Sequence, residues 1–524
     1  MKKHIFISLI LLSFGFCSCN DWLSDPTPGV TKLRDFFTSG STAIQSVNAA
    51  YQPMMWEYNT TYYPEWFVGD IVSDDALKGG QSIGDMADVY DMENFKTSTN
   101  NKFLLDFYRA QYQGIARCNL VLQEVPKMHT DTLMDTRLQK RLIGEVKFLR
   151  AMYYFRLVRI FGGVPKIDFV IDSSSKWKQS RATTDDIYKF ITEDLEDAQK
   201  TLWRKSEYPA TDLGRVTKGA AQAMLLKTYL YMHNYDKAKE WGDSIIESNA
   251  KHNEYKLVSK YRENFTLEGE NGPESVFEIQ YMEDPMSDYG EGNGFTRGTF
   301  SIILMRSRSS LLGGGWGFNK PTQNLYEEYE VNDPRRNETI LNPTDEQIET
   351  PEQEIYLHSS RYLNKKYALM NEDGTYYKLT HATRGPINIK VIRYADVLLM
   401  YAEACCETGN LNRAKWALEL VRERARQGNN NILPPFPYGN YSDNQDDLRK
   451  AIRHERRVEL GMEGHRWFDL CRWGIAKEVM DAYKTTENAE VQKEMASFIK
   501  EKHELFPIPA EEINLNPMDQ NPGY

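Results

Sequence analysis

The stretch "IRHERRVELGMEGHRWFDLCRWG", residues 452–474, decides the fold of this chain. Acidic and basic side chains alternate along it, and like charges stand one helical turn apart, as at Glu455 and Glu459. Like charges at this spacing destabilise an isolated surface helix. Arginine suits partners on other segments, because its planar guanidinium binds a carboxylate with two hydrogen bonds. The stretch therefore predicts a charged helix whose side chains pair with distant parts of the chain.

The same stretch has a catalytic alternative, in which paired carboxylates would act as acid and base. The residues in question are Glu455, Glu459, Glu463 and Asp469. Carboxylates pair by chance in many charged helices, and His454-Glu455 does not continue into a metal-binding HExxH motif, since Val458 stands in place of the second histidine. The structural interpretation is therefore favoured. Gly461 and Gly464 predict the end of this helix, and a second helix is expected to end at Gly474.

Helical periodicity covers much of the rest of the chain. Two stretches, 228–246 and 400–421, both contain a helix, a short polar turn and a helix, with a small Ala238 or Ala414 after the turn. This pattern is similar to the tetratricopeptide helical hairpin. The two copies are far apart, so long insertions are expected to interrupt the hairpins. The predicted helical regions are 40–58 with 103–126, 137–160 with 184–202, 215–250, 391–427 and 446–484.

Two long insertions have a different composition. Residues 59–100 and 251–385 are rich in Gly, Asp, Asn, Tyr and Ser, and the alternation in "SVFEIQY" (275–281) predicts a short strand. Folded proteins seldom keep such long loops without a function. The expected fold is mostly α, with helical hairpins on one side, a loop-rich side and a few short strands. The proline-rich end, residues 506–524, is expected to lie along the body because Phe506, Ile508 and Ile513 give it an apolar side.

The composition of the chain limits the classes of function that it can have. A net charge of −11 spread along the chain provides no basic surface for nucleic acid. The chain holds 31 Tyr, 23 Phe and 10 Trp, and a surplus of Tyr and Trp suits flat ligands with an apolar face. The cysteines and histidines have no zinc-site spacing, and no GxSxG or Walker A motif is present. We expect no metal, no cofactor and no catalytic residues.

The first 18 residues have the pattern of a signal peptide. Lys2 and Lys3 precede an apolar run, "IFISLILLSFGF" (5–16), which is short for a membrane span. An ordinary secretory signal is one interpretation. A lipoprotein signal is favoured, because its peptidase requires a small residue before the lipidated cysteine, and Ser18 precedes Cys19. We therefore expect residues 1–18 to be removed and Cys19 to carry the lipid anchor.

The chain resembles the SusD/RagB family of outer-membrane nutrient-binding lipoproteins of Bacteroidetes. The opening stretch is similar to the C-terminal signature of that family, here residues 446–524. Further segments agree in order: "CNDWLSDPTPG" (19–29), "FFTSGSTAIQSVNAAY" (36–51), "VSDDA" (72–76), "YRAQYQGIARCNLVL" (108–122), "GEVKFLRAMYYFRLVRIFGGVP" (144–165), "GRVTKGAAQAMLLKTYLY" (214–231), "IRYADVLLMYAEA" (392–404) and "FPIPAEEINLNPMDQNPGY" (506–524). The resemblance covers nearly all of residues 19–524, which it identifies as one SusD-like domain.

The resemblance implies a mostly α-helical domain of four tetratricopeptide-type hairpins with a loop-rich ligand side. It also implies a place on the outer face of the outer membrane, as the lid of a SusC-like TonB-dependent transporter. Such proteins capture oligosaccharides, or in some cases peptides, without cleaving them. The implied function of this chain is therefore to bind an oligosaccharide and deliver it to the transporter. The alternatives are a peptide-binding RagB-like protein, a surface glycan-degrading enzyme and a pure interaction scaffold.

The resemblance places the ligand residues in and after the "SDD"-type segment and in the central insertion. Aromatic rings stack on the C–H faces of sugars, and carboxylates, amides and guanidinium groups bind the hydroxyls. Other roles remain open: Asp74 as a helix cap, Trp316 as a core residue beside a turn, and the tyrosines as ordinary surface residues. The predicted ligand residues are Asp74, Tyr90, Tyr289, Phe295, Trp316 and Arg384.

Overall fold

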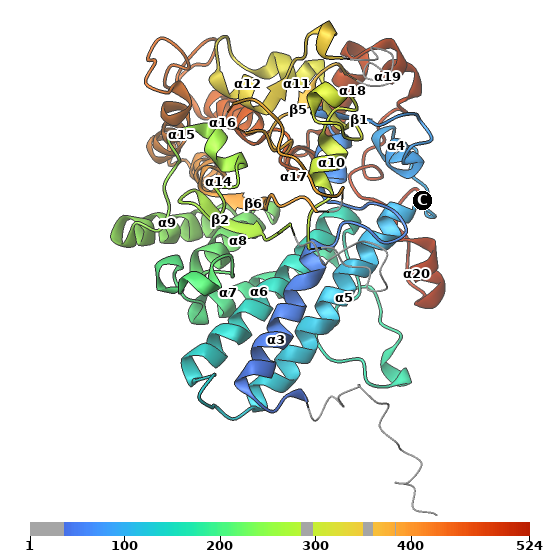
Figure 1. Cartoon of the computed structure of the whole chain (residues 1–524), viewed down its shortest axis with the longest axis vertical. Helices are drawn as coiled ribbons and strands as arrows, with labels where there is room; N and C mark the ends of the chain where they lie inside the picture. Colours follow the sequence, from blue (N-terminus) through green and yellow to red (C-terminus); the bar gives the residue numbers. More distant parts are fainter. Residues whose placement is uncertain (1–35, 284–296, 349–359, 372, 383) are drawn as a thin grey trace, which may run out of the picture.

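Long helices, each packed against the next in the chain, form one side of the molecule (Figure 1). The structure is a computed structural model, and it describes residues 36–283, 297–348, 360–371, 373–382 and 384–524. The series continues from α9 to α14 across the central insertion, and α16 packs on α14 and α15. The helices are α3 (Gly40–Tyr51), α5 (Lys102–Glu124), α6 (Thr136–Phe161), α7 (Thr184–Thr201), α8 (Lys218–Tyr231), α9 (Tyr235–His252), α14 (Tyr394–Glu407), α15 (Leu411–Arg426) and α16 (Gln445–Leu460).

Local sequence explains where these helices begin and how closely they approach. The side chain of Asp135 accepts a hydrogen bond from the amide of Leu138 at the start of α6, and Thr183 does the same for Asp186 at α7. Small residues lie at the crossings: a Cβ atom on Gly114 of α5 would stand 2.3 Å from the ring of Tyr153 on α6. The helical side is therefore tightly packed.

The helical predictions are confirmed in outline and wrong at two boundaries. The first helix ends at Tyr51 rather than at residue 58, because Pro53 lacks an amide hydrogen and begins a short 3₁₀ turn, η1 (Gln52–Met55). The helix expected from residue 391 begins at Tyr394. The residues before it, rich in β-branched side chains, form strand β6 (Ile389–Arg393) instead. The two predicted helix–turn–helix stretches are present as α8–α9 and α14–α15. The small residue after each turn, Ala238 or Ala414, is fully buried. Assignment of the hairpins to the tetratricopeptide type stays a prediction.

The rest of the molecule, mostly in the upper half of Figure 1, consists of short elements joined by loops, while α20 lies at the right beside α5. Its three described sheets are antiparallel pairs: β1 with β3, β2 with β6, and β4 with β5. Strand β2 confirms the strand expected near residue 275. The elements are β1 (Ala76–Gly79), α4 (Ala87–Glu93), β2 (Ser275–Ile279), α10 (Ser301–Met305), β3 (Phe318–Pro321), α11 (Gln323–Glu328), α12 (Pro334–Thr339), β4 (Ile340–Leu341) and β5 (Leu363–Asn364), followed after α16 by α17 (Arg466–Arg472), α18 (Ala476–Thr486), α19 (Ala489–Glu494) and α20 (Ala510–Leu515).

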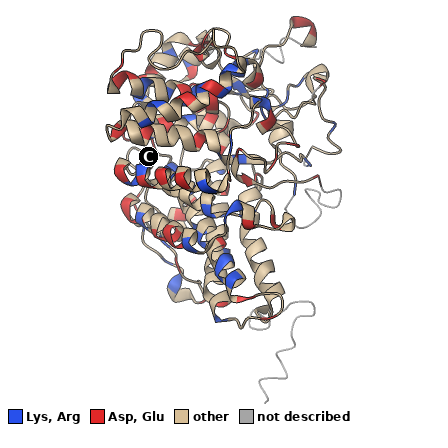
Figure 2. Cartoon of the chain, turned by 90° about the vertical axis from the view of Figure 1, so that its left-hand side faces the viewer, with Lys and Arg blue, Asp and Glu red and all other residues tan. Residues whose placement is uncertain are grey.

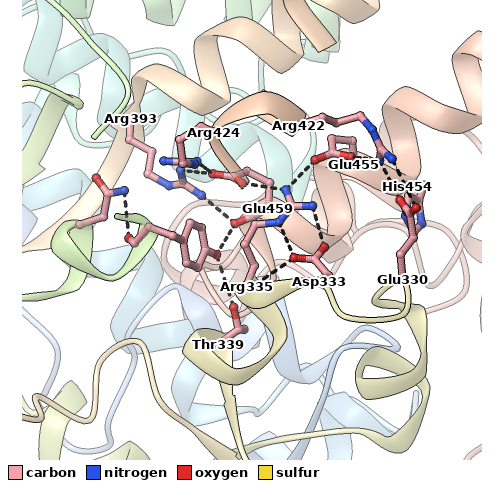
Figure 3. A network of polar contacts seen from close by, with 12 residues as sticks. Glu330, Asp333, Arg335, Thr339, Arg393, Arg422, Arg424, His454, Glu455 and Glu459 are labelled. Atoms are coloured by element: carbon pink, nitrogen blue, oxygen red, sulfur yellow. Dashed lines mark hydrogen bonds and ion pairs between the residues drawn. The ribbon is translucent and has the colours of Figure 1, made fainter. Parts of the chain in front are cut away.

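A buried ion-pair network joins α16 to the segments around it (Figure 3). Glu459 is fully buried and contacts three guanidinium groups, from Arg335, Arg393 and Arg424. One turn earlier, Glu455 bridges Arg335 at 2.5 Å and Arg422 at 2.7 Å. These arginines lie on α12, β6 and α15. The prediction that the charges of this helix pair with distant segments is confirmed.

The network continues beyond the part drawn in Figure 3. Arg456 bridges Asp396 of α14 and Asp469 of α17, both at 2.6 Å. The predicted break at Gly461 and Gly464 separates α16 from α17. Figure 2 shows acidic and basic residues interleaved along the helices rather than gathered on separate faces. Ion pairing in this region therefore serves to hold segments together.

The remaining expectations concern the ends of the chain and its cysteines. Residues 1–35, with the signal peptide and Cys19, lie outside the described residues. Within the described part of the chain, no helix is both long and apolar enough to cross a membrane. Phe506 and Ile508 are buried, which confirms that the proline-rich end lies along the body. Cys118, Cys405 and Cys406 are buried free thiols.

Candidate functional site: an aromatic cluster on the loop-rich side

A tight loop after η1 presents two tyrosines on the loop-rich side. Tyr58 and Tyr62 face each other as an isolated antiparallel pair, with ring centroids 4.7 Å apart. The loop closes through the amide of Tyr63, which donates to the carbonyl of Glu57 at 2.7 Å. Both rings are half-buried. The backbone of this short turn therefore determines where two aromatic side chains lie.

Phe300, just before α10, packs beneath the two tyrosines. Its ring centroid lies 5.0 Å from that of Tyr62 and 6.1 Å from that of Tyr58. The buried carboxylate of Glu57 accepts hydrogen bonds from the amide of Phe300 at 2.7 Å and from the hydroxyls of Thr299 and Ser301. Burial raises the pKa of Glu57, and these hydrogen bonds partly oppose that shift. Glu57 thus joins the tyrosine loop to α10.

Trp316 completes the cluster from a glycine-rich turn. Its half-buried ring meets Tyr62 edge-on, with centroids 5.5 Å apart. The turn runs close to α10, since the amide of Trp316 donates to the carbonyl of Ile303 at 2.8 Å. A Cβ atom on Gly315 would stand 2.7 Å from that same carbonyl oxygen, so only glycine fits there. Trp316 is therefore in contact with the core, and part of its ring reaches the surface.

Arg384 lies beside the same cluster. It precedes Gly385, whose backbone pairs with that of Thr299 through two hydrogen bonds of 2.8 and 3.2 Å. Arg384 is half-buried, and its charge helps to lower the pKa of Glu283, although hydrogen bonds from Thr380 and Tyr377 lower that pKa more. The backbone pairing thus places the segment that carries Arg384 next to Thr299, the residue before Phe300 of the cluster.

Asp74 has a different position. It is 2% exposed and binds Arg466 with both carboxylate oxygens, at 2.7 and 2.9 Å, and also contacts Arg457. Burial alone would raise the pKa of Asp74, but the two arginines hold it at about 2. The helix that Asp74 might have capped is absent, because strand β1 begins at Ala76. The geometry therefore gives Asp74 a role in the interior ion-pair network rather than at a ligand surface.

The remaining predicted residues are not brought to the cluster. Tyr90 lies on α4 and is buried, with the ammonium group of Lys78 5.8 Å from its ring centroid. Its burial gives no support to a role as a surface aromatic. Tyr289 and Phe295 lie outside the described residues, so their ligand role stays a prediction.

The interpretation of the sequence missed Tyr58, Tyr62 and Phe300. The periodicity predicts a helix through Tyr58, but that helix stops earlier, and the pattern does not divide the loop that holds Tyr62. The local signal is "EYNTTYY" (57–63), where three polar residues separate Tyr58 from Tyr62 after a helix that ends before a proline. The contact of Phe300 with this loop joins residues more than 200 positions apart, and the sequence pattern carried no sign of it.

This arrangement suits stacking against a flat apolar face. Among the described residues, no group of three or more His, Cys, Asp and Glu side chains is placed to hold a metal ion. Glu57 also lines a pocket of ≈ 80 Å³, together with charged and aromatic side chains from both sides of the molecule, and the pocket has room for several water molecules.

Comparison with known families identifies the chain. The model of the SusD family matches residues 273–524, and a second model, described as "Starch-binding associating with outer membrane", matches residues 34–230. Together these matches span most of the chain, on both the helical and the loop-rich side. The chain belongs to the SusD family. The resemblance seen in the sequence and the mostly helical SusD-like fold are both confirmed.

Three proteins similar to this SusD-family chain match it along their full length. "SusD-like protein P2" of Formosa agariphila is 26% identical over all of both chains. A solved "Laminarin binding SusD-like protein" is 28% identical, covers 93% of this chain and all of its own, and superposes with a TM-score of 0.77. "Surface glycan-binding protein A" of Bacteroides thetaiotaomicron, solved with laminarihexaose, is 25% identical, with 92% of this chain and all of its own covered and a TM-score of 0.77.

Proposed function

We propose that this protein binds an oligosaccharide at the cell surface and passes it, uncleaved, to a SusC-like TonB-dependent transporter. The observation that carries the proposal is the cluster of half-buried rings formed by Tyr58, Tyr62 and Trp316 on the loop-rich side. Similar proteins of the same length are named for binding laminarin or were solved with laminarihexaose, which supports a glycan rather than a peptide.

The physical basis is the shape of a sugar ring. A pyranose presents C–H groups on one face and hydroxyls at its rim, so an aromatic face can cover the first while polar side chains bind the second. Trp316 and Tyr62 supply aromatic surface, and the guanidinium groups of Arg384 and Arg308 lie on the adjacent segments. Arg308 donates to the carbonyl of Trp316 at 3.1 Å, which holds this cation next to the backbone of Trp316.

The direct test is calorimetry with hexaoses of different linkage, namely laminarihexaose, cellohexaose and maltohexaose. We expect one of them to bind, and Trp316→Ala to weaken that binding about tenfold or more, as truncation of a central aromatic contact does. Trp177→Ala is the matched control, because Trp177 is 69% exposed and lies on the α6–α7 connection, away from the cluster. Binding unaffected by Trp316→Ala, or absent with every glycan, would contradict the proposal.

The remaining parts of the proposal need separate measurements. New reducing ends after incubation with the bound glycan would show an enzyme rather than a binding protein. The lipid anchor is proposed at Cys19, in an outer membrane, and labelling with a fatty acid that Cys19→Ala abolishes would support it. Co-purification of the transporter from detergent-solubilised outer membranes would support the proposed partner, and recovery of this chain alone would count against it.

A further inference from the structure

We infer that Asp106 and Glu57, two buried carboxylates, are positioning residues that hold the aromatic cluster in the arrangement that meets the ligand. This inference rests on the proposed function. Asp106 lies on α5, is 3% exposed and reaches the loop that carries Tyr58 and Tyr62 from beneath. Glu57 is 7% exposed and stands at the base of the same loop. With so little exposure, both carboxylates act through the rings that they place.

Asp106 binds the tip of the loop with four hydrogen bonds. Its Oδ2 accepts from the amides of Thr60 and Thr61, at 2.9 and 3.0 Å, and from the hydroxyl of Thr60 at 2.8 Å. Its Oδ1 accepts from Nδ2 of Asn59 at 2.9 Å. Three consecutive residues between the two tyrosines are therefore fastened to one side chain of a long helix.

The loop also has restraints of its own. Within the described residues, its internal backbone hydrogen bonds join the amide of Asn59 to the carbonyl of Thr61 and the amide of Tyr63 to the carbonyl of Glu57. Asn59 and Thr60, at the tip of the loop, are exposed. Charge-assisted hydrogen bonds to a carboxylate are stronger than neutral ones. The four hydrogen bonds to Asp106 therefore fasten the exposed tip of the loop to α5.

Glu57 fixes the second half of the cluster relative to the first. Its Oε2 accepts from Thr299 at 2.8 Å and from the amide of Phe300 at 2.7 Å, while Oε1 accepts from Ser301 at 2.9 Å. Ser301 in turn accepts a hydrogen bond from the indole of Trp66 at 3.0 Å. The ring of Phe300 is consequently held under Tyr58 and Tyr62, and the backbone of Thr299 is held beside Gly385.

The consequence for binding follows from conformational entropy. A ligand that must first order a mobile loop loses part of its interaction free energy to that ordering. If the aromatic loop occupies its binding arrangement only part of the time, the apparent Kd rises by the inverse of that fraction. The two carboxylates keep the fraction close to one.

The test is Asp106→Asn, with hydrogen exchange and calorimetry on the same full-length protein. The carboxylate of Asp106 has two acceptor oxygens for its four hydrogen-bond donors, whereas an asparagine side chain has only one. We expect amides of residues 58–63 to exchange at least tenfold faster, and the Kd for the glycan bound by the wild type to rise three- to tenfold. Glu57→Gln is expected to act in the same direction on residues 299–301.

Asp131→Asn is the matched control for a general loss of stability. Asp131 likewise accepts backbone hydrogen bonds, from Gly40, Leu133 and Met134, but at the opposite end of α3. The Asp131→Asn substitution is expected to lower the melting temperature and to leave the Kd for the glycan unchanged. If Asp106→Asn does not fold, Thr60→Val serves in its place, because it removes one donor from an exposed residue.

The outcomes separate the two proposals. Faster local exchange with a weaker Kd, absent in Asp131→Asn, supports positioning by Asp106. Unchanged Kd in Asp106→Asn or Thr60→Val, in a protein whose wild type binds a glycan, overturns the inference and leaves the proposed function standing. Failure of the wild type to bind any glycan overturns the proposed function, and the inference with it.

Discussion

Asp70 has a buried carboxyl group whose surroundings disfavour the charged form. It is fully buried in the short π-helix η2 (Phe67–Ile71), where it accepts hydrogen bonds from the amide of Gly464 at 2.8 Å and from Nδ2 of Asn319 at 3.0 Å. Burial raises the pKa of Asp70 to about 7, and the charge of Asp75 adds to the rise. The Oδ1 atom of Asn319 has no hydrogen-bond partner among the described residues.

This carboxyl makes stability depend on pH. Its folded pKa of about 7 exceeds the ordinary 3.8, so the folded state holds the proton more tightly, and the stabilisation present below about pH 4 is lost as the pH rises through 7. In Asp70→Asn, an amide hydrogen can reach Oδ1 of Asn319 after that side chain flips. We therefore expect the variant to match the wild type at pH 4 and to exceed it at pH 8 by about 1–3 kcal/mol. Urea unfolding at both values checks this, and equal differences at the two would contradict it.

For single residues, the sequence indicated which types of side chain suit a ligand, but it did not indicate which of these side chains are exposed. Trp316 lies in the aromatic cluster, and Arg384 lies next to Gly385, whose backbone pairs with that of Thr299. Asp74 and Tyr90 come from the other insertion, residues 59–100, and both are buried. Composition does not distinguish a ring or a carboxylate at the surface from one inside, because that depends on which segment covers it.

At the scale of elements, His454 connects α16 to the segment of α11. Its Nδ1 lies 2.6 Å from Oε1 of Glu328. Its Nε2 lies 3.5 Å from Oε1 of Glu330, which Figure 3 shows beside it. Burial alone would lower the pKa of His454, but the hydrogen bonds and charges of the two glutamates outweigh it and raise the pKa to about 9. The charged imidazolium therefore contributes to the attachment of the loop-rich side to α16.

The sign of the resulting pH dependence follows from that pKa. The folded value of about 9 lies above the ordinary 6.5, so the stabilisation is complete below pH 6.5 and is lost as the pH rises through 9. We expect His454 to contribute about 2–3 kcal/mol of unfolding free energy that is lost across this range. His454→Gln should be less stable than the wild type at pH 6, and the difference between the two should shrink by about that amount between pH 6.5 and 9. If the unfolding free energies of the wild type and the variant change in parallel with pH, the result would argue against this role of His454.

Helices were predictable from the sequence where one face is continuously apolar, as in α5 and α6. The ends of helices and strands were less predictable from the sequence. Pro53 ends α3 early, and Ile389–Arg393 became a strand because β2 offers it an antiparallel partner. The partner lies more than 100 residues away in the sequence, so no local pattern distinguishes this strand from the first turn of a helix.

At the scale of the whole molecule, Glu459 is the shared carboxylate of segments far apart in the chain. Arg335 lies 2.9 Å from its Oε2 and Arg393 lies 2.6 Å from its Oε1, and Arg424 contacts the same oxygen. Burial alone would raise the pKa of Glu459, but the arginines hold it well below its usual range. Removal of the negative charge would leave three buried guanidinium groups around a neutral side chain.

We therefore expect Glu459→Gln to lower the free energy of unfolding by about 3–5 kcal/mol, the usual cost of removing one partner from a buried ion pair. Asp481→Asn is the matched control. Asp481 pairs with Lys477 at 2.6 Å, but both side chains are almost half exposed, so the expected loss is below about 1 kcal/mol. Chemical denaturation of the two variants side by side checks the difference, and similar losses would argue against a central role for the network.

By itself, the sequence determined the helical side, the loop-rich side and the need of residues 452–474 for distant partners. Those properties follow from local periodicity, turn residues and charge spacing, which a single stretch of chain contains. The tertiary structure decided which arginines meet Glu459, which rings surround Trp316 and which carboxylates became buried. These depend on contacts between segments up to several hundred residues apart, and the free energy of such contacts arises only when folding excludes water from between them.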